Sequence, residues 1–295
     1  MLTADLFRKI RQIEIRTRRL VKDTFAGDYH AVFKGRGMAF DEVRPYTPGD
    51  EIRTIDWNVT ARMGDPYIKR FVEERELTVL LVVDASASGD FGSVGRFKRE
   101  LAAEITAVIA FAATSNNDNV GLLIFTDRVE LYIPPRKGRK HILRLIRELL
   151  VFEPEGRGTD IKLALDTVNQ VLKRRGIVFV VSDFLDEIDQ FRGTLAVTNK
   201  RHDVVAIDLE DPLESEIAHV GLLVLEDAET GEMMWVDTNS RSWRESFAAQ
   251  QDELAQAKRQ LFNRTRVDRV AVTTADDYVI PLASFFRRRL RRLGR

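Results

Sequence analysis

Three short segments of the sequence hold oxygen-bearing side chains in patterns that suit chemistry. The string DASAS at residues 84–88 combines one carboxylate with two hydroxyls, and GRGTD at 156–160 places Thr159 beside glycines that let its backbone approach another loop closely. A third segment ends an apolar run with Ser182 and Asp183. Taken singly, each residue is explained as a cap of a helix. Together they favour a cation site built from oxygen ligands, and the two interpretations stay open on these residues alone.

The elements that must position these segments alternate between strands and helices from residue 77 onward. Aliphatic and β-branched runs predict buried strands, and helically spaced apolar residues predict helices between them. The predicted strands cover residues 77–84, 120–125, 129–133, 177–181, 203–209 and 267–273, with a hairpin over 221–237 that turns at 229–231. The predicted helices cover 95–114, 139–152, 160–174, 186–198, 241–263 and a basic terminal segment.

This alternation predicts an α/β fold, a doubly wound and mainly parallel sheet with helices on both faces. Such sheets bind ligands in the crevice beyond the carboxyl ends of their strands. The DASAS segment directly follows the first buried strand, and Asp183 follows the strand at 177–181. Both segments are therefore expected at the edge of the sheet where chemistry is most often found.

The region before this pattern is predicted to be a separate N-terminal extension over residues 1–75, with residues 76–295 as the α/β domain. Four apolar residues at helical spacing predict an initial helix: Leu6, Ile10, Ile13 and Leu20. This basic helix is expected to pack on the following domain, with a membrane surface as the alternative. Glycines and prolines then predict a loop-rich stretch up to Trp57.

The DxSxS string, the threonine of GxGTD and the Ser-Asp pair after a strand resemble the metal-ion-dependent adhesion site of von Willebrand factor A domains. More narrowly, FKGRGMAFDEVRPYTPGDEIRTIDWNVTAR and KRFVEERELTVLLVVDASAS resemble the bacterial, MoxR-associated family called domain of unknown function 58, over nearly the full chain. The resemblance implies a Rossmann-like A domain with an N-terminal extension, encoded beside a MoxR-type AAA+ ATPase. Gly89 departs from the common pattern, in which many members have Met, but it is not a ligand in that scheme.

The resemblance also implies a bound Mg²⁺, with Mn²⁺ or Ca²⁺ as alternatives. Ser86 and Ser88 would ligate it through their hydroxyls, and Thr159 would do so directly or through water. Asp84 and Asp183 would act mainly through waters or by orienting the hydroxyls. With few anionic ligands the metal would keep one open position, which a carboxylate from a partner protein would fill.

A second candidate segment lies in the extension and is the most distinctive part of the family resemblance. Its turn residues and mixed charges predict an ordered loop, clamped by an Arg–Asp pair and a packed Trp. A surface that contacts the ATPase is the alternative, and the sequence does not decide between them. The residues concerned are Arg44, Tyr46, Asp50, Arg53, Asp56 and Trp57.

The composition excludes several kinds of enzyme. The chain has no cysteine, and its four histidines show no paired spacing, so thiol chemistry and His-based metal centres are not expected. No GxxxxGK[ST] motif occurs, which argues against ATP hydrolysis by this chain. We therefore expect a non-enzymatic, metal-dependent protein-interaction module, an adaptor for a MoxR-type ATPase in complex assembly or maturation. A Mg²⁺-dependent phosphate hydrolase is the alternative, although Ser86 stands where an aspartyl-phosphate phosphatase usually has a second Asp.

Charge is balanced overall but unevenly distributed. Lys and Arg number 46, as do Asp and Glu, so the chain is not a strongly basic nucleic-acid binder. Residues 203–253 hold 14 acidic against two basic residues, whereas 254–295 hold 11 basic and three acidic. Binding of nucleic acid or of an anionic membrane through the basic C-terminus is a further alternative, and a solvated helix end is favoured. No apolar run approaches the roughly 20 residues of a membrane span, so a cytoplasmic protein is expected. A monomer is expected because the sequence shows no coiled-coil heptad and no clear apolar interface patch.

Overall fold

A computed structural model of the chain describes residues 11, 15, 17, 20–21, 26–33, 39–72, 76–215, 217, 219–226 and 231–293. Its contacts divide the chain into two compact units, the smaller spanning Phe33–Leu77 and the larger combining Met1–Val32 with Thr78–Arg295. The predicted division at residue 75 differs from this, because the short helix α2 (Ala26–Phe33) packs with the larger unit: its Tyr29 is buried and donates a hydrogen bond to Asp118 over 3.2 Å.

The larger unit is built on a six-stranded sheet with the order β10-β7-β6-β3-β4-β5. All neighbouring strands are parallel except β5, which runs antiparallel to β4. The strands are β3 (Thr78–Asp84), β4 (Asn119–Phe125), β5 (Val129–Arg136), β6 (Ile177–Ser182), β7 (Asp203–Glu210) and β10 (Asp268–Thr273). The central strands are buried along their length, as their uninterrupted apolar runs predict.

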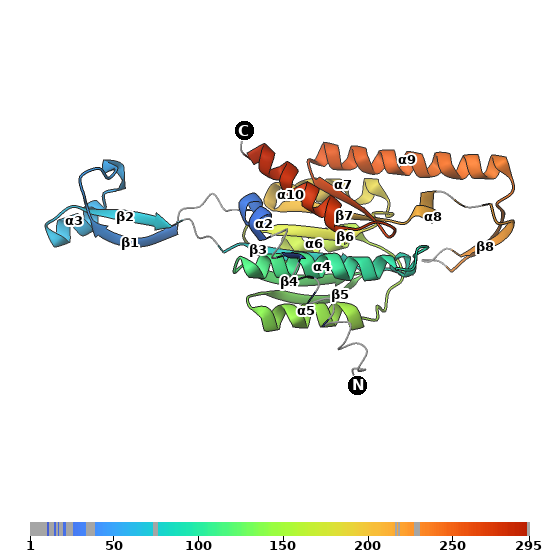
Figure 1. The fold of residues 1–295 in the computed structure, drawn as a ribbon, viewed down its shortest axis with the longest axis horizontal. Coiled ribbons are helices and arrows are strands. Elements are labelled where there is room, and N and C mark those ends of the chain that lie inside the picture. Colours follow the sequence, from blue (N-terminus) through green and yellow to red (C-terminus); the bar gives the residue numbers. More distant parts are fainter. Residues whose placement is uncertain are drawn as a thin grey trace. The chain divides into compact units, whose positions relative to one another are not determined.

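Helices cover both faces of this sheet (Figure 1). One side carries α6 (Ile161–Val171), α7 (Ile188–Arg201) and α9 (Arg241–Thr265). The other side carries α4 (Lys98–Ser115), α5 (Arg139–Val151), α10 (Val279–Leu293) and α2. The predicted α/β fold class, a doubly wound and mainly parallel sheet, is confirmed.

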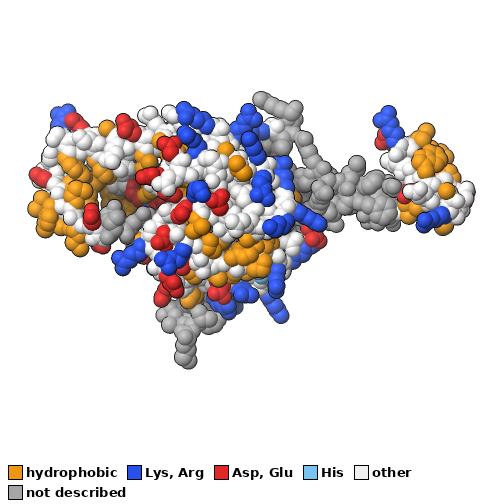
Figure 2. All heavy atoms as spheres, turned by 180° about the vertical axis from the view of Figure 1, so that it is seen from behind, with side chains coloured by type: hydrophobic (Ala, Val, Ile, Leu, Met, Phe, Trp, Pro, Cys, Tyr) orange, Lys and Arg blue, Asp and Glu red, His pale blue; other side chains and the backbone are white. Residues whose placement is uncertain are grey.

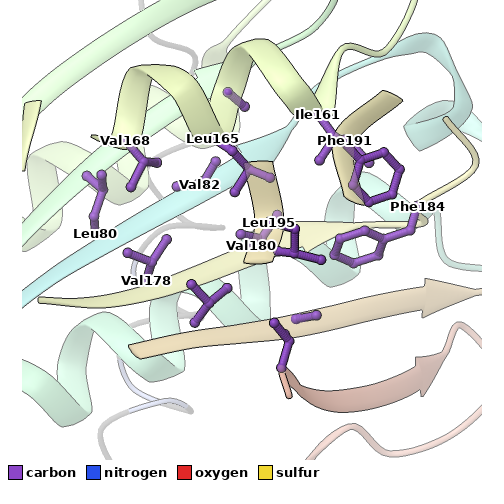
Figure 3. Packing of buried hydrophobic residues seen from close by; sticks show 14 of the residues in the cluster. Leu80, Val82, Ile161, Leu165, Val168, Val178, Val180, Phe184, Phe191 and Leu195 are labelled. Carbon is purple, nitrogen blue, oxygen red and sulfur yellow. The ribbon is translucent and has the colours of Figure 1, made fainter. Parts of the chain in front are cut away.

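The core beneath α6, α7 and α9 shows how the strands direct alternate residues to opposite faces (Figure 3). Leu80 and Val82 point to this face together with Val178 and Val180, and Leu165 packs against them from α6. Their neighbours along each strand face α4 on the other side. Apolar packing closes both faces of the sheet. Polar side chains that come from the strands and form a site are therefore expected at the strand ends.

A two-stranded ribbon, β8 (Leu222–Glu226) with β9 (Met233–Asp237), confirms the predicted hairpin, although Glu229 and Thr230 of its turn lie outside the described residues. Residues Leu6, Ile10 and Ile13 of the predicted first helix also lie outside them, while Leu20 is helical. The small unit is more regular than its loop-rich sequence predicts. It contains β1 (Ala39–Pro45) paired with β2 (Tyr67–Val72), the 3-10 helix η2 (Ile52–Thr54) and the helix α3 (Trp57–Met63).

Candidate functional site

The candidate site lies where β3 and β6 end side by side. Asp84 is the last residue of β3, and one of its carboxylate oxygens accepts a hydrogen bond from the Ser86 backbone N–H over 2.9 Å. Its other oxygen accepts one from the Ser182 hydroxyl over 2.6 Å. Ser182 is the last residue of β6, so the parallel pairing of the two strands brings these groups together. The Asp84 carboxylate is therefore held by groups from two neighbouring strands, Ser86 after β3 and Ser182 at the end of β6.

The two serines of the DASAS segment face each other across the turn that follows β3. The hydroxyl oxygens of Ser86 and Ser88 lie 3.0 Å apart, and Ser88 belongs to the 3-10 helix η3 (Ala87–Asp90). Together with Asp84 and Asp183 they line a cavity of about 10 Å³, the space of about one water-sized sphere. Four of the five residues predicted to hold a metal therefore meet at one small cavity.

The fifth predicted residue, Thr159, is not among those that line this cavity. Its segment does reach the site, because the Ala87 backbone N–H donates to the Arg157 carbonyl over 3.0 Å. The following residue, Asp160, caps α6 by accepting a hydrogen bond from the Leu163 backbone N–H over 2.7 Å. The contribution of Thr159 to a metal site stays a prediction.

The carboxylates of Asp84 and Asp183 line the same small cavity. Burial, and next to it the negative charge of Asp183, raise the pKa of Asp84 to about 7, against the lowering effect of its hydrogen bonds from Ser182 and Ser86. Asp183 is itself only 4% exposed, and its Oδ1 is buried without a hydrogen-bond partner among the described residues. An unsatisfied buried carboxylate oxygen beside a second carboxylate is the arrangement that a cation would complete.

A buried lysine that the sequence analysis did not single out lies in the wall of the same cavity. Lys98 begins α4, is 1% exposed, and places its ammonium 2.7 Å from Asp183 Oδ2. It also donates to Glu214 of the short helix α8 (Pro212–Ser215). Burial by itself lowers the pKa of Lys98, but the two carboxylates outweigh it and raise that pKa. The available signal was a lysine within an otherwise apolar helix face.

A second buried lysine holds Asp183 from the opposite side. Lys258 of α9 donates to the Asp183 carbonyl and lies 3.2 Å from Asp208 Oδ1 on β7. Asp208 in turn lies 2.6 Å from the guanidinium of Arg269 on β10. The backbone after β6 is thereby fixed, so that only the Asp183 side-chain oxygen Oδ1 is left for a further ligand.

The donor set suits a hard divalent cation. Two carboxylates and two or three hydroxyls offer only oxygen, which Mg²⁺, Mn²⁺ and Ca²⁺ prefer. No group of three or more His, Asp or Glu side chains placed to hold a metal occurs in the part of the chain that the structure describes. A metal at this site would bind through few anionic ligands and would retain waters.

The small cavity shares Asp84, Ser86, Arg99 and Ala102 with a larger one of about 680 Å³, whose walls come from several parts of the unit. Asp84 and Ser86 lie on one side with Phe91, and Arg157 lies on another. The third wall is formed by residues 224–226 of β8. The hairpin therefore borders the candidate site.

In the small unit, the predicted Arg–Asp clamp is present. The guanidinium of Arg44 contacts both oxygens of Asp50, over 2.7 and 2.9 Å, and the Thr47 backbone N–H donates to Asp50 over 2.9 Å. The hydrogen bond from Arg44, followed by those from Thr47, lowers the pKa of Asp50 to about 2. Asp56 caps α3 through the backbone N–H of Asn58 over 3.0 Å.

The predicted packing of the tryptophan is wrong. Trp57 is 67% exposed, and it is the first residue of α3, a short helix without a buried residue. Arg53 is exposed as well, whereas Tyr46 is half-buried. Of the segment's six predicted residues, Arg44, Asp50 and Asp56 thus hold the local structure, and Trp57 and Arg53 are available at the surface.

Residues 42–257 match the family model described as "Protein of unknown function DUF58". The chain belongs to this family. The uncharacterized protein Rv1480 of Mycobacterium tuberculosis (strain ATCC 25618 / H37Rv) is 36% identical over 224 residues, which cover 75% of this chain and 70% of that protein. The uncharacterized protein YeaD of Bacillus subtilis (strain 168) is 27% identical over 109 residues, or 37% of this chain and 25% of that protein.

Solved structures resemble this DUF58 protein in fold. An aerotolerance-related membrane protein from Bacteroides fragilis NCTC 9343 aligns with a TM-score of 0.51 and 14% identity over 73% of this chain and 99% of that one. The SpRpn10 VWA domain aligns with a TM-score of 0.41 and 10% identity, over 72% of this chain and 95% of that one. The predicted family and fold class are confirmed. Among the described residues of this DUF58 protein, no helix is both long and apolar enough to span a bilayer.

Proposed function

We propose that this DUF58 protein is a non-enzymatic protein-interaction module whose contact passes through a divalent cation at the ends of β3 and β6. The observation that carries the proposal is the buried Oδ1 of Asp183, which lacks a hydrogen-bond partner among the described residues and shares its cavity with Asp84 and two serine hydroxyls. A cation supplies the missing partner and relieves the repulsion between the carboxylates.

In this proposal Ser86 and Ser88 bind the cation through their hydroxyls, and Asp84 and Asp183 bind it through waters or orient those hydroxyls. The bound cation would offer one open coordination position to an oxygen ligand. In this proposal a ligand would reach that position from the larger cavity, which Asp84 and Ser86 also line. A carboxylate side chain of a partner protein is the ligand whose charge and hardness suit it. Thr159 belongs to the proposal as a further ligand, direct or through water.

The cation is tested by titrating Mg²⁺ and Mn²⁺ into the purified chain by calorimetry, with Asp183→Asn as the variant. Asp166→Asn is a matched control, because Asp166 lies on α6 and is 43% exposed in a surface pair with Lys162. Binding in wild type and in the control, with a loss of about tenfold or more in Asp183→Asn, is expected. Equal affinities in all three proteins would overturn the cation site.

The finer part of the proposal is the partner, a MoxR-type AAA+ ATPase that this chain serves as adaptor in complex assembly or maturation. Affinity capture of that ATPase with wild type in Mg²⁺, its release by chelator, and its loss with Asp84→Ala are expected. Retention of the ATPase by Asp84→Ala in chelator would instead place the contact elsewhere, with the exposed Arg53 and Trp57 of the small unit as the next surface to test.

The alternatives are less well supported by the geometry. Both Asp84 oxygens accept hydrogen bonds and its pKa is raised, which weakens it as the nucleophile of a phosphate hydrolase. In the basic terminal helix, Arg289 and Arg292 both pair with Asp268 of β10, so part of its charge ties α10 to the sheet. A structural role for these arginines favours protein binding over nucleic acid or membrane binding.

A further inference from the structure

One face of the β8–β9 hairpin is apolar and uncovered. Residues directly opposite in an antiparallel ribbon share a face, and the register pairs Val224 with Trp235 between the pairs Leu222–Asp237 and Glu226–Met233. The apolar members of this face are all exposed large hydrophobic residues. Their exposed fractions are 63% for Leu222, 43% for Val224, 70% for Met233 and 69% for Trp235.

The hairpin is held firmly at its base, so this exposure is not that of a loosely attached loop. Thr238 is fully buried, and its hydroxyl donates to the Gly221 carbonyl over 2.7 Å and accepts from the Val220 backbone N–H over 3.0 Å. The guanidinium of Arg244 on α9 donates to the Thr238 carbonyl. Val236, on the opposite face, is 3% exposed. The structure thus presents a fixed apolar face, the kind of surface that marks a protein-binding site.

The described residues on the face itself include two acidic side chains and no basic one. Glu226 and Asp237, both exposed, stand at its two ends, paired with Met233 and Leu222. Figure 2 shows hydrophobic side chains gathered at the end of the domain where β8 lies in Figure 1. A partner must therefore supply apolar anchors and positive charge.

We propose that this hairpin face, Leu222, Val224, Met233 and Trp235 between Glu226 and Asp237, is a docking site for an amphipathic protein segment rich in Lys and Arg. Trp is among the residues that most often anchor protein contacts, Met is enriched at interfaces, and flexible Met side chains adapt to different apolar partners. The acidic ends select against anionic membranes and nucleic acids, which like charge repels. Val224 and Glu226 also border the larger cavity beside the proposed cation site, but none of the contacts of the docking site needs a metal.

The test uses the full chain and a fluorescently labelled synthetic peptide built from Leu and Lys in amphipathic helical order, with a second peptide in which Glu replaces Lys. The double variant Trp235→Ser, Met233→Ser removes the apolar anchors without changing charge. Its matched control is Trp57→Ser, Met63→Ser in the small unit, where the two side chains are 67% and 61% exposed. Thermal unfolding of each variant checks that the exposed positions leave the fold intact.

Binding of the Lys peptide to wild type and to the control, at least tenfold weaker binding to the hairpin variant, and no binding of the Glu peptide are expected. The affinity should fall with salt and stay unchanged in chelator and in Asp183→Asn, which separates this site from the cation site. Equal loss in both double variants, or equal binding of the two peptides, would overturn the proposal. So would sedimentation showing a dimer that the hairpin variant abolishes, since a second copy would then cover the face.

Discussion

The ammonium of Lys98 lies 2.7 Å from Asp183 Oδ2, on the carboxylate whose other oxygen has no hydrogen-bond partner among the described residues. This relationship fixes the orientation of the Asp183 side chain and leaves Oδ1 for a cation. It also supplies a permanent positive charge beside the cavity. The proposed cation thus has to bind next to an ammonium, which reduces the net negative charge that attracts it.

Replacing Lys98 tests both its ion pair with Asp183 and the effect of its positive charge on cation binding. Lys98→Met leaves Asp183 and Glu214 without their ammonium, so the metal-free protein should lose about 3–5 kcal/mol of unfolding free energy. Because a cation can then supply the missing charge, the rise in Tm on adding Mg²⁺ should exceed that of wild type. Differential scanning calorimetry with and without Mg²⁺ measures both. Lys162→Met, which removes an exposed helical pair, is the control, and a variant that behaves like it would contradict this account.

The raised pKa of Asp84 predicts that the site costs stability when no metal is bound. The folded-state pKa of about 7 lies above the ordinary 3.8, so the folded protein holds this proton more tightly than the unfolded chain. The stability it contributes is fully present below about pH 4 and is lost as pH rises through about 7. Asp84→Asn should therefore stabilise the metal-free protein at pH 8, on the order of 1–2 kcal/mol, and have little effect at pH 4.

Denaturant unfolding of Asp84→Asn and wild type at both pH values checks this dependence. Asp189→Asn is the control, because Asp189 is 86% exposed and its loss should change stability little at either pH. Destabilisation by Asp84→Asn at pH 8 would show that the carboxylate is held ionised without cost, which would contradict the account in which burial and the charge of Asp183 outweigh the two hydrogen bonds.

The sheet and its covering helices were predictable because each central strand is a continuous apolar run bounded by turn residues. The same logic failed in the small unit, since β1 pairs only with β2 in a two-stranded ribbon. Such a ribbon buries little and therefore needs no apolar run. The predicted start of α4 at residue 95 also differs from the observed Lys98, because Phe97 precedes the helix in extended backbone. Local propensity does not specify such boundaries to the residue.

The candidate site was predictable where its residues follow strands directly, since parallel strand ends must meet. Asp84, Ser86 and Asp183 follow this rule, and they line one cavity. Lys98 does not, because its partners Asp183 and Glu214 are 85 and 116 residues away, and the apolar helix face around it indicates at most its burial, not its partners. Long-range ion pairs of this kind arise from packing, which periodicity does not encode.

The ion pair between Arg44 and Asp50 in the small unit allows a prediction about the pKa of Asp50. Arg44→Ala removes the hydrogen bond that most lowers the pKa of Asp50, so the midpoint of the Asp50 carboxyl should rise from about 2 toward 3.8. In wild type the stabilisation from this carboxylate is present above about pH 4 and is lost as pH falls through about 2. Carbon-13 NMR of the side-chain carboxyl measures the midpoint. Arg62→Ala, on an exposed position of α3, should leave it unchanged.

Gly156 provides a steric test of the segment that carries Thr159. A Cβ at this position would lie 2.0 Å from Asp127 Oδ1 and 2.2 Å from the hydroxyl oxygen of Thr126, which is fully buried. Gly156→Ala should therefore displace the segment and cost about 1–3 kcal/mol of unfolding free energy. If Thr159 takes part in the cation site, the affinity for Mn²⁺ should fall in the same variant.

Gly193→Ala is the control for this substitution, because Gly193 lies within α7 and a Cβ there meets nothing within 4 Å. A helix-interior change from Gly to Ala stabilises by about 0.5–1 kcal/mol, opposite in sign to the effect expected at Gly156. Chemical denaturation and Mn²⁺ titration of both variants give the two readings. If Gly156→Ala is destabilised but keeps its full Mn²⁺ affinity, the segment that carries Thr159 takes no part in the cation site. The residues of the proposed site would then be Asp84, Ser86, Ser88 and Asp183.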